Sequence, residues 1–255
     1  MIREPHPASR FRTMQRMSRR IAAAGLVLAA LWIGNAAALE CGSNNGYTCT
    51  GTQNQYAGGF NPGVGYGGSC FPKDTRALIH IAEDVGLPLP LVSATESINA
   101  RQKRRLFDKL LAHFGKREDE PLALTGKRIA VWGLSFKPET DDVREAPALT
   151  LIEKLVALGA EVRAYDPVAS ETARQSLSAT LKEKMSQVEI VASAYDALPD
   201  ADALCLCTEW RQLRQPDFRK IVRLLRGKLL LDGRNIWDPA QVRAAGLVYQ
   251  GIGRR

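Results

Sequence analysis

Short apolar segments alternate with helical patterns along the second half of the chain, and this alternation constrains the fold more than any other feature. Six segments have the composition of strands: 127–134 (KRIAVWGL), 161–167 (EVRAYDP), 188–193 (VEIVAS), 201–207 (ADALCLC), 228–234 (KLLLDGR) and 247–253 (LVYQGIG). Helical patterns lie at 147–159, 170–185, 218–227 and 238–246. Strands that alternate with helices form βαβ units with a parallel sheet. The pattern predicts the α/β class, with a doubly wound, mostly parallel, Rossmann-like sheet domain over residues 119–255.

A helical central segment is expected before this domain, at residues 65–118. Apolar residues at helical spacing predict a helix over Thr75–Val85, with Gly86 as its C-cap. A second and longer helix is predicted over Leu91–Phe114, ending at Gly115. The charged stretch KREDEPLALTG follows it and fits a linker to the sheet domain.

The N-terminal 40 residues differ in character from the rest of the chain. From Met17 a cationic stretch precedes an apolar stretch at 21–33, and three alanines at 36–38 fit a cleavage site. This order of parts is typical of a secretory signal, so we interpret residues 1–40 as a signal-like segment. The alternative is a buried helix, or an untranslated leader sequence that has been read as protein. The apolar stretch is short for a bilayer, so no integral membrane span is expected.

Residues 41–64 are rich in glycine, asparagine, threonine and glutamine, and they predict a flexible linker. Cys41 and Cys49 lie in it and could form a disulfide after export. The net charge is +8, but six arginines and one glutamate in the first twenty residues supply +5 of it. Since no basic stripe is interleaved with aromatic residues, we expect no nucleic-acid partner.

Cys205 and Cys207 occupy alternate positions of one apolar segment, so both point to the same face of a strand. We interpret them as small core residues, because unpaired cysteine is commonly buried. A C-x-C pair with no further cysteine or histidine cluster is a weak signal for metal, and we expect no metal site.

The stretch GYGGSCFPKD places a thiol, Cys70, after a run of glycines and before a lysine and an aspartate. Four stretches, WGLSFKP, AYDP, CTEW and DGRN, fall where predicted strands end. Ligands of parallel sheets bind outside these carboxyl ends. No G-x-G-x-x-G sequence opens a helix after a strand, so the sheet need not bind a dinucleotide in the usual way.

These stretches occur together in one known order. GYGGSCFPKDTRAL, GLSFKPETDDVREAPAL, VRAYDP, TEW and LLDGRNIWDP follow one another from about Pro62 to the C-terminus. In their residues and in their order these motifs resemble those of the UDP-glucose 6-dehydrogenase family. The resemblance implies oxidation of UDP-glucose to UDP-glucuronate with two NAD⁺.

The resemblance also implies roles for individual residues. Cys70 would be the nucleophile, forming a thiohemiacetal and then a thioester, and Asp74 would assist with water or proton transfer. Lys73 and the start of the following helix would favour the Cys70 thiolate. Further contacts are implied for two ligands: Lys73 and Arg144 with NAD, and Gly67, Lys137 and Arg234 with the UDP-sugar.

The chain departs from the family in one respect. Complete members have an N-terminal Rossmann domain, and only 64 residues precede Gly65 here. We therefore expect a truncated enzyme that is weak or inactive alone; an inactive nucleotide-sugar-binding remnant or an exported fusion is the alternative. The expected partners are UDP-glucose and either a second copy, through the helix Leu91–Phe114, or a complementing N-terminal half. The family implies a cytoplasmic location, with export as the alternative.

Overall fold

The computed structural model describes residues 63–254. The signal-like segment and the cysteines at 41 and 49 therefore lie outside the described residues. All described residues belong to one compact unit. Among them, no helix is both long and apolar enough to cross a membrane.

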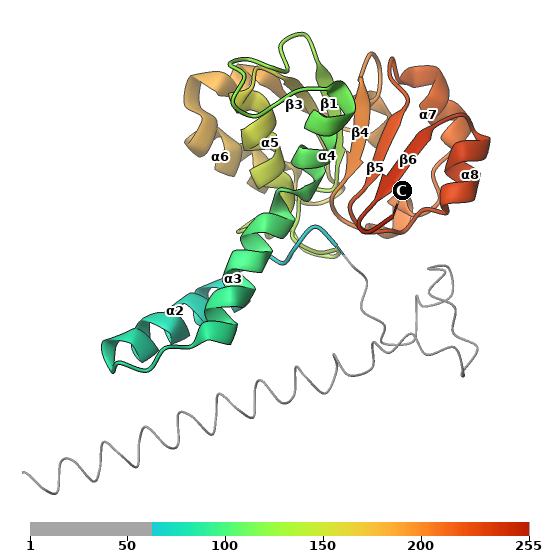
Figure 1. Ribbon diagram of the computed structural model, residues 1–255. Coiled ribbons are helices and arrows are strands. Elements are labelled where there is room, and N and C mark those ends of the chain that lie inside the picture. The colour runs from blue at the N-terminus through green and yellow to red at the C-terminus, as the bar shows by residue number, and fades with distance from the viewer. Residues whose placement is uncertain (1–62, 255) are drawn as a thin grey trace, which may run out of the picture. The chain divides into compact units, whose positions relative to one another are not determined.

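Six parallel strands form the sheet, as the sequence predicts (Figure 1). They are β1 (Arg128–Trp132), β2 (Glu161–Tyr165), β3 (Val188–Ile190), β4 (Ala203–Leu206), β5 (Leu229–Asp232) and β6 (Val248–Gly251). Their order in the sheet is β3-β2-β1-β4-β5-β6, and all five pairings between neighbours are parallel. The chain therefore winds outward in both directions from β1 and β4, which confirms the predicted doubly wound α/β fold.

Side chains of β1 alternate between two apolar cores, one on each face of the sheet. Ile129 and Val131 join the core covered by α4 (Arg105–Phe114), α5 (Pro147–Ala157) and α6 (Ser170–Leu181). Ala130 and Trp132 join the other core, which includes residues of α7 (Phe218–Leu224), α8 (Pro239–Ala244) and the 3₁₀ turns η3 (Ala194–Ala197) and η4 (Arg211–Leu213). The sheet is thus buried on both faces, as parallel sheets require. Cys205 and Cys207 are 0% and 1% exposed in the first core, as predicted.

The predicted helix over Leu91–Phe114 is wrong as a single element, because the chain forms α3 (Pro90–Lys103) and α4 with Arg104 between them. The Arg104 N–H donates to the carbonyl of Arg101, three residues back, so the regular helical spacing tightens at this point. The two parts also have different surroundings. Residues of α4 enter the core of the sheet, whereas α3 packs with α2 (Phe71–Asp84).

Two other helix limits differ from the prediction. The first helix begins at Phe71 rather than Thr75, because Pro72 suits the first turn of a helix, where an N–H is not needed. The predicted helix at 170–185 ends at Leu181 and continues as the 3₁₀ helix η2 (Lys182–Gln187). Lys182 has φ +52°, and a left-handed residue cannot continue an α-helix.

Candidate active site

The glycine loop places Cys70 at the start of α2. Cys70 is the N-cap of this 14-residue helix. The first helical hydrogen bond runs from the Asp74 N–H to the Cys70 carbonyl at 2.8 Å. Cys70 is exposed. Its thiol therefore lies at the positive end of the α2 helix dipole and is open to solvent.

Two ion pairs lie beside Cys70. Lys73 pairs with Asp74, and both side chains are largely exposed. Arg144 pairs with Asp142 through two contacts of 2.9 and 2.7 Å. The carboxylate partners raise the pKa of Lys73 and of Arg144, and the Cys70 thiolate adds a smaller rise to each pKa. Both cations are thus within electrostatic reach of the Cys70 sulfur, and each already has a carboxylate partner.

The glycines allow the loop to lie directly against the turn that joins β1 to α5. The Gly68 N–H donates to the Arg144 carbonyl at 2.8 Å. A Cβ at Gly67 would lie 2.4 Å from the Glu145 carbonyl oxygen, and one at Gly68 would lie 3.0 Å from the Phe136 ring. Close approach within the protein therefore requires glycine at both positions, before any sugar is considered.

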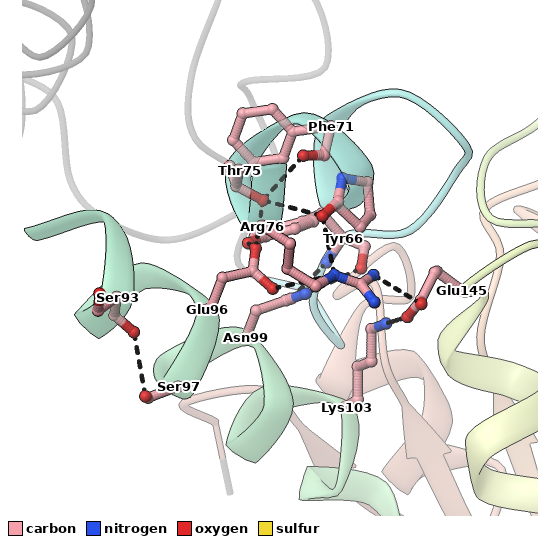
Figure 2. A network of polar contacts seen from close by, with 11 residues as sticks. Tyr66, Phe71, Thr75, Arg76, Ser93, Glu96, Ser97, Asn99, Lys103 and Glu145 are labelled. Atoms are coloured by element: carbon pink, nitrogen blue, oxygen red, sulfur yellow. Dashed lines mark hydrogen bonds and ion pairs between the residues drawn. The ribbon is translucent and has the colours of Figure 1, made fainter. Parts of the chain in front are cut away.

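Helix α3 fixes the same loop through two polar side chains (Figure 2). The Asn99 side chain accepts from the Tyr66 N–H at 2.8 Å and donates to the Tyr66 carbonyl at 3.1 Å. Glu96 accepts from the hydroxyls of Tyr66 at 2.5 Å and Thr75 at 2.6 Å. Burial, and then the Glu96 carboxylate, raise the pKa of Tyr66, so its hydroxyl stays protonated and donates. The backbone before Cys70 is thus held by both α3 and the sheet domain.

Arg234 and Lys137 lie at the carboxyl ends of the strands. Arg234 donates from Nε to the Cys207 carbonyl at 2.8 Å and from a terminal nitrogen to the Phe136 carbonyl at 3.0 Å. Its Nε is also 2.9 Å from the Glu209 carboxylate. Lys137 is exposed, with Nζ 5.3 Å from the centroid of the Phe136 ring. Arg234 is therefore largely engaged within the protein, whereas Lys137 faces solvent.

Phe136 joins the two groups of predicted site residues. Its ring lies against the position of Gly68 in the loop, and its carbonyl accepts from Arg234. The structure thus brings the residues predicted around the thiol (Gly67, Cys70, Lys73, Asp74 and Arg144) next to the turn that carries Lys137 and contacts Arg234. Their roles toward ligands stay predictions.

A buried carboxylate occupies the first βα turn of the sheet. It belongs to Asp166, which follows β2 in the sequence and is 2% exposed. Its side chain reaches across to the neighbouring turn, which follows β1. Its oxygens accept from six donors: the N–H groups of Leu134, Ser135, Val168 and Ala169, the Ser135 hydroxyl and the Trp210 indole. In dinucleotide-binding sheets the N–H groups of this turn hold a pyrophosphate. Here they hold Asp166, so this turn does not fit a dinucleotide pyrophosphate.

Sequence reasoning missed several residues that organise the site. Asp166 had a signal, since AYDP was recognised as a strand end, but its carboxylate points into the protein. Glu145 could have been considered as a site residue, because it follows Arg144, a predicted cofactor contact, directly in the sequence. Asn99 had none, because a polar residue within a helical pattern usually faces solvent, and this one is 6% exposed.

Two regions of the chain match domains of one protein family. Residues 45–101 match the UDP-glucose/GDP-mannose dehydrogenase family, central domain. Residues 130–239 match the UDP binding domain of the same family. The two regions together include the thiol loop and the carboxyl ends of the central strands.

Individual relatives agree with these matches. The chain is 48% identical over 194 residues to UDP-glucose 6-dehydrogenase of Pseudomonas aeruginosa, covering 75% of this chain and 41% of that protein. It is 43% identical over 192 residues to UDP-glucose 6-dehydrogenase TuaD of Bacillus subtilis, covering 75% of this chain and 39% of that one. The structure of a UDP-glucose dehydrogenase from Pyrobaculum islandicum aligns with TM-score 0.61 at 33% identity, over 76% of this chain and 39% of that chain. The chain thus spans about two fifths of the length of these relatives.

Proposed function

Because this chain belongs to the UDP-glucose/GDP-mannose dehydrogenase family, we propose that it forms the thiol-bearing and sugar-nucleotide-binding part of an NAD-dependent UDP-glucose 6-dehydrogenase. One observation carries the proposal: an exposed cysteine at a helix N-terminus is held beside the carboxyl edge of a parallel sheet. Sugar nucleotides would bind at that edge, which brings the sugar within reach of the thiol.

The proposed reaction oxidises C6 of UDP-glucose twice, from alcohol to aldehyde to carboxylate. The Cys70 thiolate adds to the aldehyde carbon to give a thiohemiacetal, and after the second oxidation the same sulfur holds a thioester. Water then attacks the thioester carbon, which releases the carboxylate of UDP-glucuronate and returns the thiol. Asp74 is proposed to orient this water and accept its proton.

NAD⁺ is the proposed oxidant and would accept one hydride in each oxidation. Lys73 and Arg144 are proposed to contact it, because both are exposed cations beside Cys70 and suit its phosphates. Its pyrophosphate does not fit the first βα turn, whose N–H groups hold Asp166. A further domain, in a longer chain or in a complementing chain, is proposed to supply that part of the site.

Three residues are proposed to bind UDP-glucose. Lys137 and Arg234 would contact its diphosphate from the carboxyl edge of the sheet. Gly67 would let the sugar approach the loop backbone closely.

The Lys137→Ala variant is expected to weaken UDP-glucose binding about tenfold to a hundredfold, because a charge-assisted hydrogen bond contributes about 1.5–3 kcal/mol. The fold should be unaffected, because Lys137 is exposed. Titration calorimetry measures the dissociation constant. Lys220→Ala is a matched control, since its Nζ lies over the Tyr195 ring at 4.1 Å on a different part of the surface. An unchanged dissociation constant for Lys137→Ala would contradict its proposed role.

The test of the proposed function is UDP-glucose-dependent reduction of NAD⁺ by the full chain, with UDP-glucose binding measured in parallel. Turnover would support the dehydrogenase. Binding without turnover, both by the chain alone and after an NAD-binding domain of a complete family member is added, would support a second candidate, a sugar-nucleotide-binding protein that does not oxidise its ligand. The N–H groups of the first βα turn donate to Asp166 and so do not serve a dinucleotide pyrophosphate, which favours this second candidate. Absence of both binding and turnover would contradict both functions.

A second copy of the chain is the proposed partner of the central helices. Four apolar side chains of α2, its C-cap and α3 are more than half exposed: Ile81, Val85, Leu91 and Ile98. Burying such side chains is favourable, so sedimentation velocity is expected to show a dimer. An Ile98→Glu variant should shift the chain to the monomer, whereas Val168→Glu, at an equally exposed position after β2, should not. A wild-type monomer at high concentration would contradict this proposal.

The proposed location is the cytoplasm, as for a family that acts on sugar nucleotides. Export stays the alternative, because the signal-like segment lies outside the described residues. The N-terminus of the mature chain, measured by mass spectrometry, separates the two.

A further inference from the structure

We infer that Glu145 is a positioning residue: it holds the Cys70 loop and the start of α2 against the sheet domain. The inference deepens the proposed function, since it rests on Cys70 as the reacting group. Four observations support it, and each concerns a different part of the Glu145 environment.

The Glu145 side chain joins two helices of the central segment to the turn between β1 and α5 (Figure 2). Its Oε1 accepts from the Arg76 guanidinium on α2 at 2.7 Å. Its Oε2 accepts from the Lys103 ammonium on α3 at 2.8 Å. One carboxylate therefore ties both helices to a turn of the sheet domain.

Lys103 makes this carboxylate necessary. Its side chain is only 9% exposed. A buried ammonium is costly unless an anion and hydrogen bonds compensate for the lost water. Glu145 supplies that anion. Without its charge the buried Lys103 ammonium would be uncompensated, which favours its movement toward solvent.

The Glu145 backbone is strained and touches the loop. Its φ is +56°, a left-handed value that costs a non-glycine residue about 1–2 kcal/mol. In this conformation the Glu145 carbonyl lies directly against Gly67, and the preceding carbonyl, of Arg144, accepts from the Gly68 N–H. The two ion pairs of the side chain help to offset the strain.

The contacts continue to the thiol through α2. Arg76, which Glu145 holds, donates from Nε to the Pro72 carbonyl at 2.9 Å. Pro72 is two residues after Cys70. The segment from Gly67 to Pro72 is thus fixed to Glu145 or its neighbour at both ends, and Cys70 lies between.

The charge of Glu145 makes this arrangement dependent on pH. Hydrogen bonds from Lys103 and then Arg76 lower the pKa of Glu145 from its ordinary value of 4.5. A lowered folded pKa means that the stabilisation is complete above the unfolded value and is lost as the pH falls through the folded one. The other charged groups around these partners are Glu96, which is 3.8 Å from Arg76, and the pair of Arg144 with Asp142.

The experiment compares the wild-type full chain with Glu145→Gln, Glu145→Asp and Arg76→Gln. Hydrogen–deuterium exchange reports the protection of the Gly68 amide, and iodoacetamide labelling followed by mass spectrometry reports the reactivity of the Cys70 peptide. Both are measured from neutral to acidic pH. Glu189→Gln is the matched control, because its carboxylate pairs with Arg163 at 2.8 Å on an exposed part of the sheet.

Glu145→Gln is expected to lower the protection of Gly68 about tenfold or more, because it removes the charge from both ion pairs, with Arg76 and with Lys103. It should leave exchange in β1 and β5 unchanged and should alter the Cys70 labelling rate. Arg76→Gln should give the same change to a smaller extent, and Glu145→Asp should restore part of the protection. The wild type should lose the protection on acidification, whereas Glu145→Gln should show no such step.

Two outcomes would overturn the inference. One is wild-type protection of Gly68 in Glu145→Gln. The other is an equal loss of protection in the sheet strands, or in Glu189→Gln, which would indicate general destabilisation. None of these measurements uses substrate or cofactor, so failure of the proposed dehydrogenase activity would leave their result intact.

Discussion

In a preparation that oxidises UDP-glucose, replacement of Cys70 by alanine is expected to reduce the formation of UDP-glucuronate by about a thousandfold or more, the usual effect of removing a covalent nucleophile. Without the thiol, the aldehyde has no group to hold it and no thioester can form. UDP-glucose affinity should stay within about twofold of wild type, because the proposed diphosphate contacts are elsewhere. Initial rates and calorimetric titration measure the two quantities on the same preparation.

Ser69→Ala provides the control for this loss. The Ser69 hydroxyl lies 3.6 Å from the Cys70 sulfur, so its removal changes the same surroundings and spares the thiol. It should retain most of the wild-type rate. If Cys70→Ala turned over at the rate of Ser69→Ala, the covalent route would be wrong.

Asp166→Ala is expected to lower the free energy of unfolding by about 3–5 kcal/mol, the usual cost of breaking a buried charged network. Alanine would leave six donors without an acceptor, among them four backbone N–H groups in the two turns that follow β1 and β2. Buried donors left unpaired carry a desolvation cost. Urea unfolding followed by circular dichroism measures the change.

Asp217→Ala tests whether the effect belongs to the buried network. Asp217 is exposed and caps α7 by accepting from the Lys220 N–H at 3.0 Å. Loss of such a cap costs about 1 kcal/mol. Equal losses for the two variants would show that Asp166 contributes only as a local cap.

Much of the sheet could be predicted from sequence, because its strands are buried on both faces. Segments such as ALCL and LLLD are short, apolar and bounded by turn residues, so their type is clear. The helix limits were harder. The break at Arg104 follows from α4 entering the core of the sheet while α3 does not, a tertiary difference that helical spacing does not contain.

The candidate site also has parts that the sequence predicts and parts that it does not. The thiol loop and the strand-end cations could be located because motifs carry them. Contacts between motifs could not, since Glu145 meets Arg76 and Lys103 across 69 and 42 residues of sequence. Asp166 shows the opposite limit: its position was recognised, but a polar residue at a strand end can face a ligand or the protein, and sequence does not distinguish the two.

The packing of α4 has a consequence for where the sheet domain begins. Four of its side chains, Leu106, Phe107, Leu110 and Leu111, belong to the same core as β1 and α5. The predicted boundary at residue 119 and the matched UDP binding region at 130 both start after them. Burying four such side chains contributes about 6–12 kcal/mol, which is comparable to the whole stability of an ordinary domain. A fragment cut at either sequence boundary would lack one wall of its own core, so the smallest self-sufficient sheet domain starts no later than Arg105.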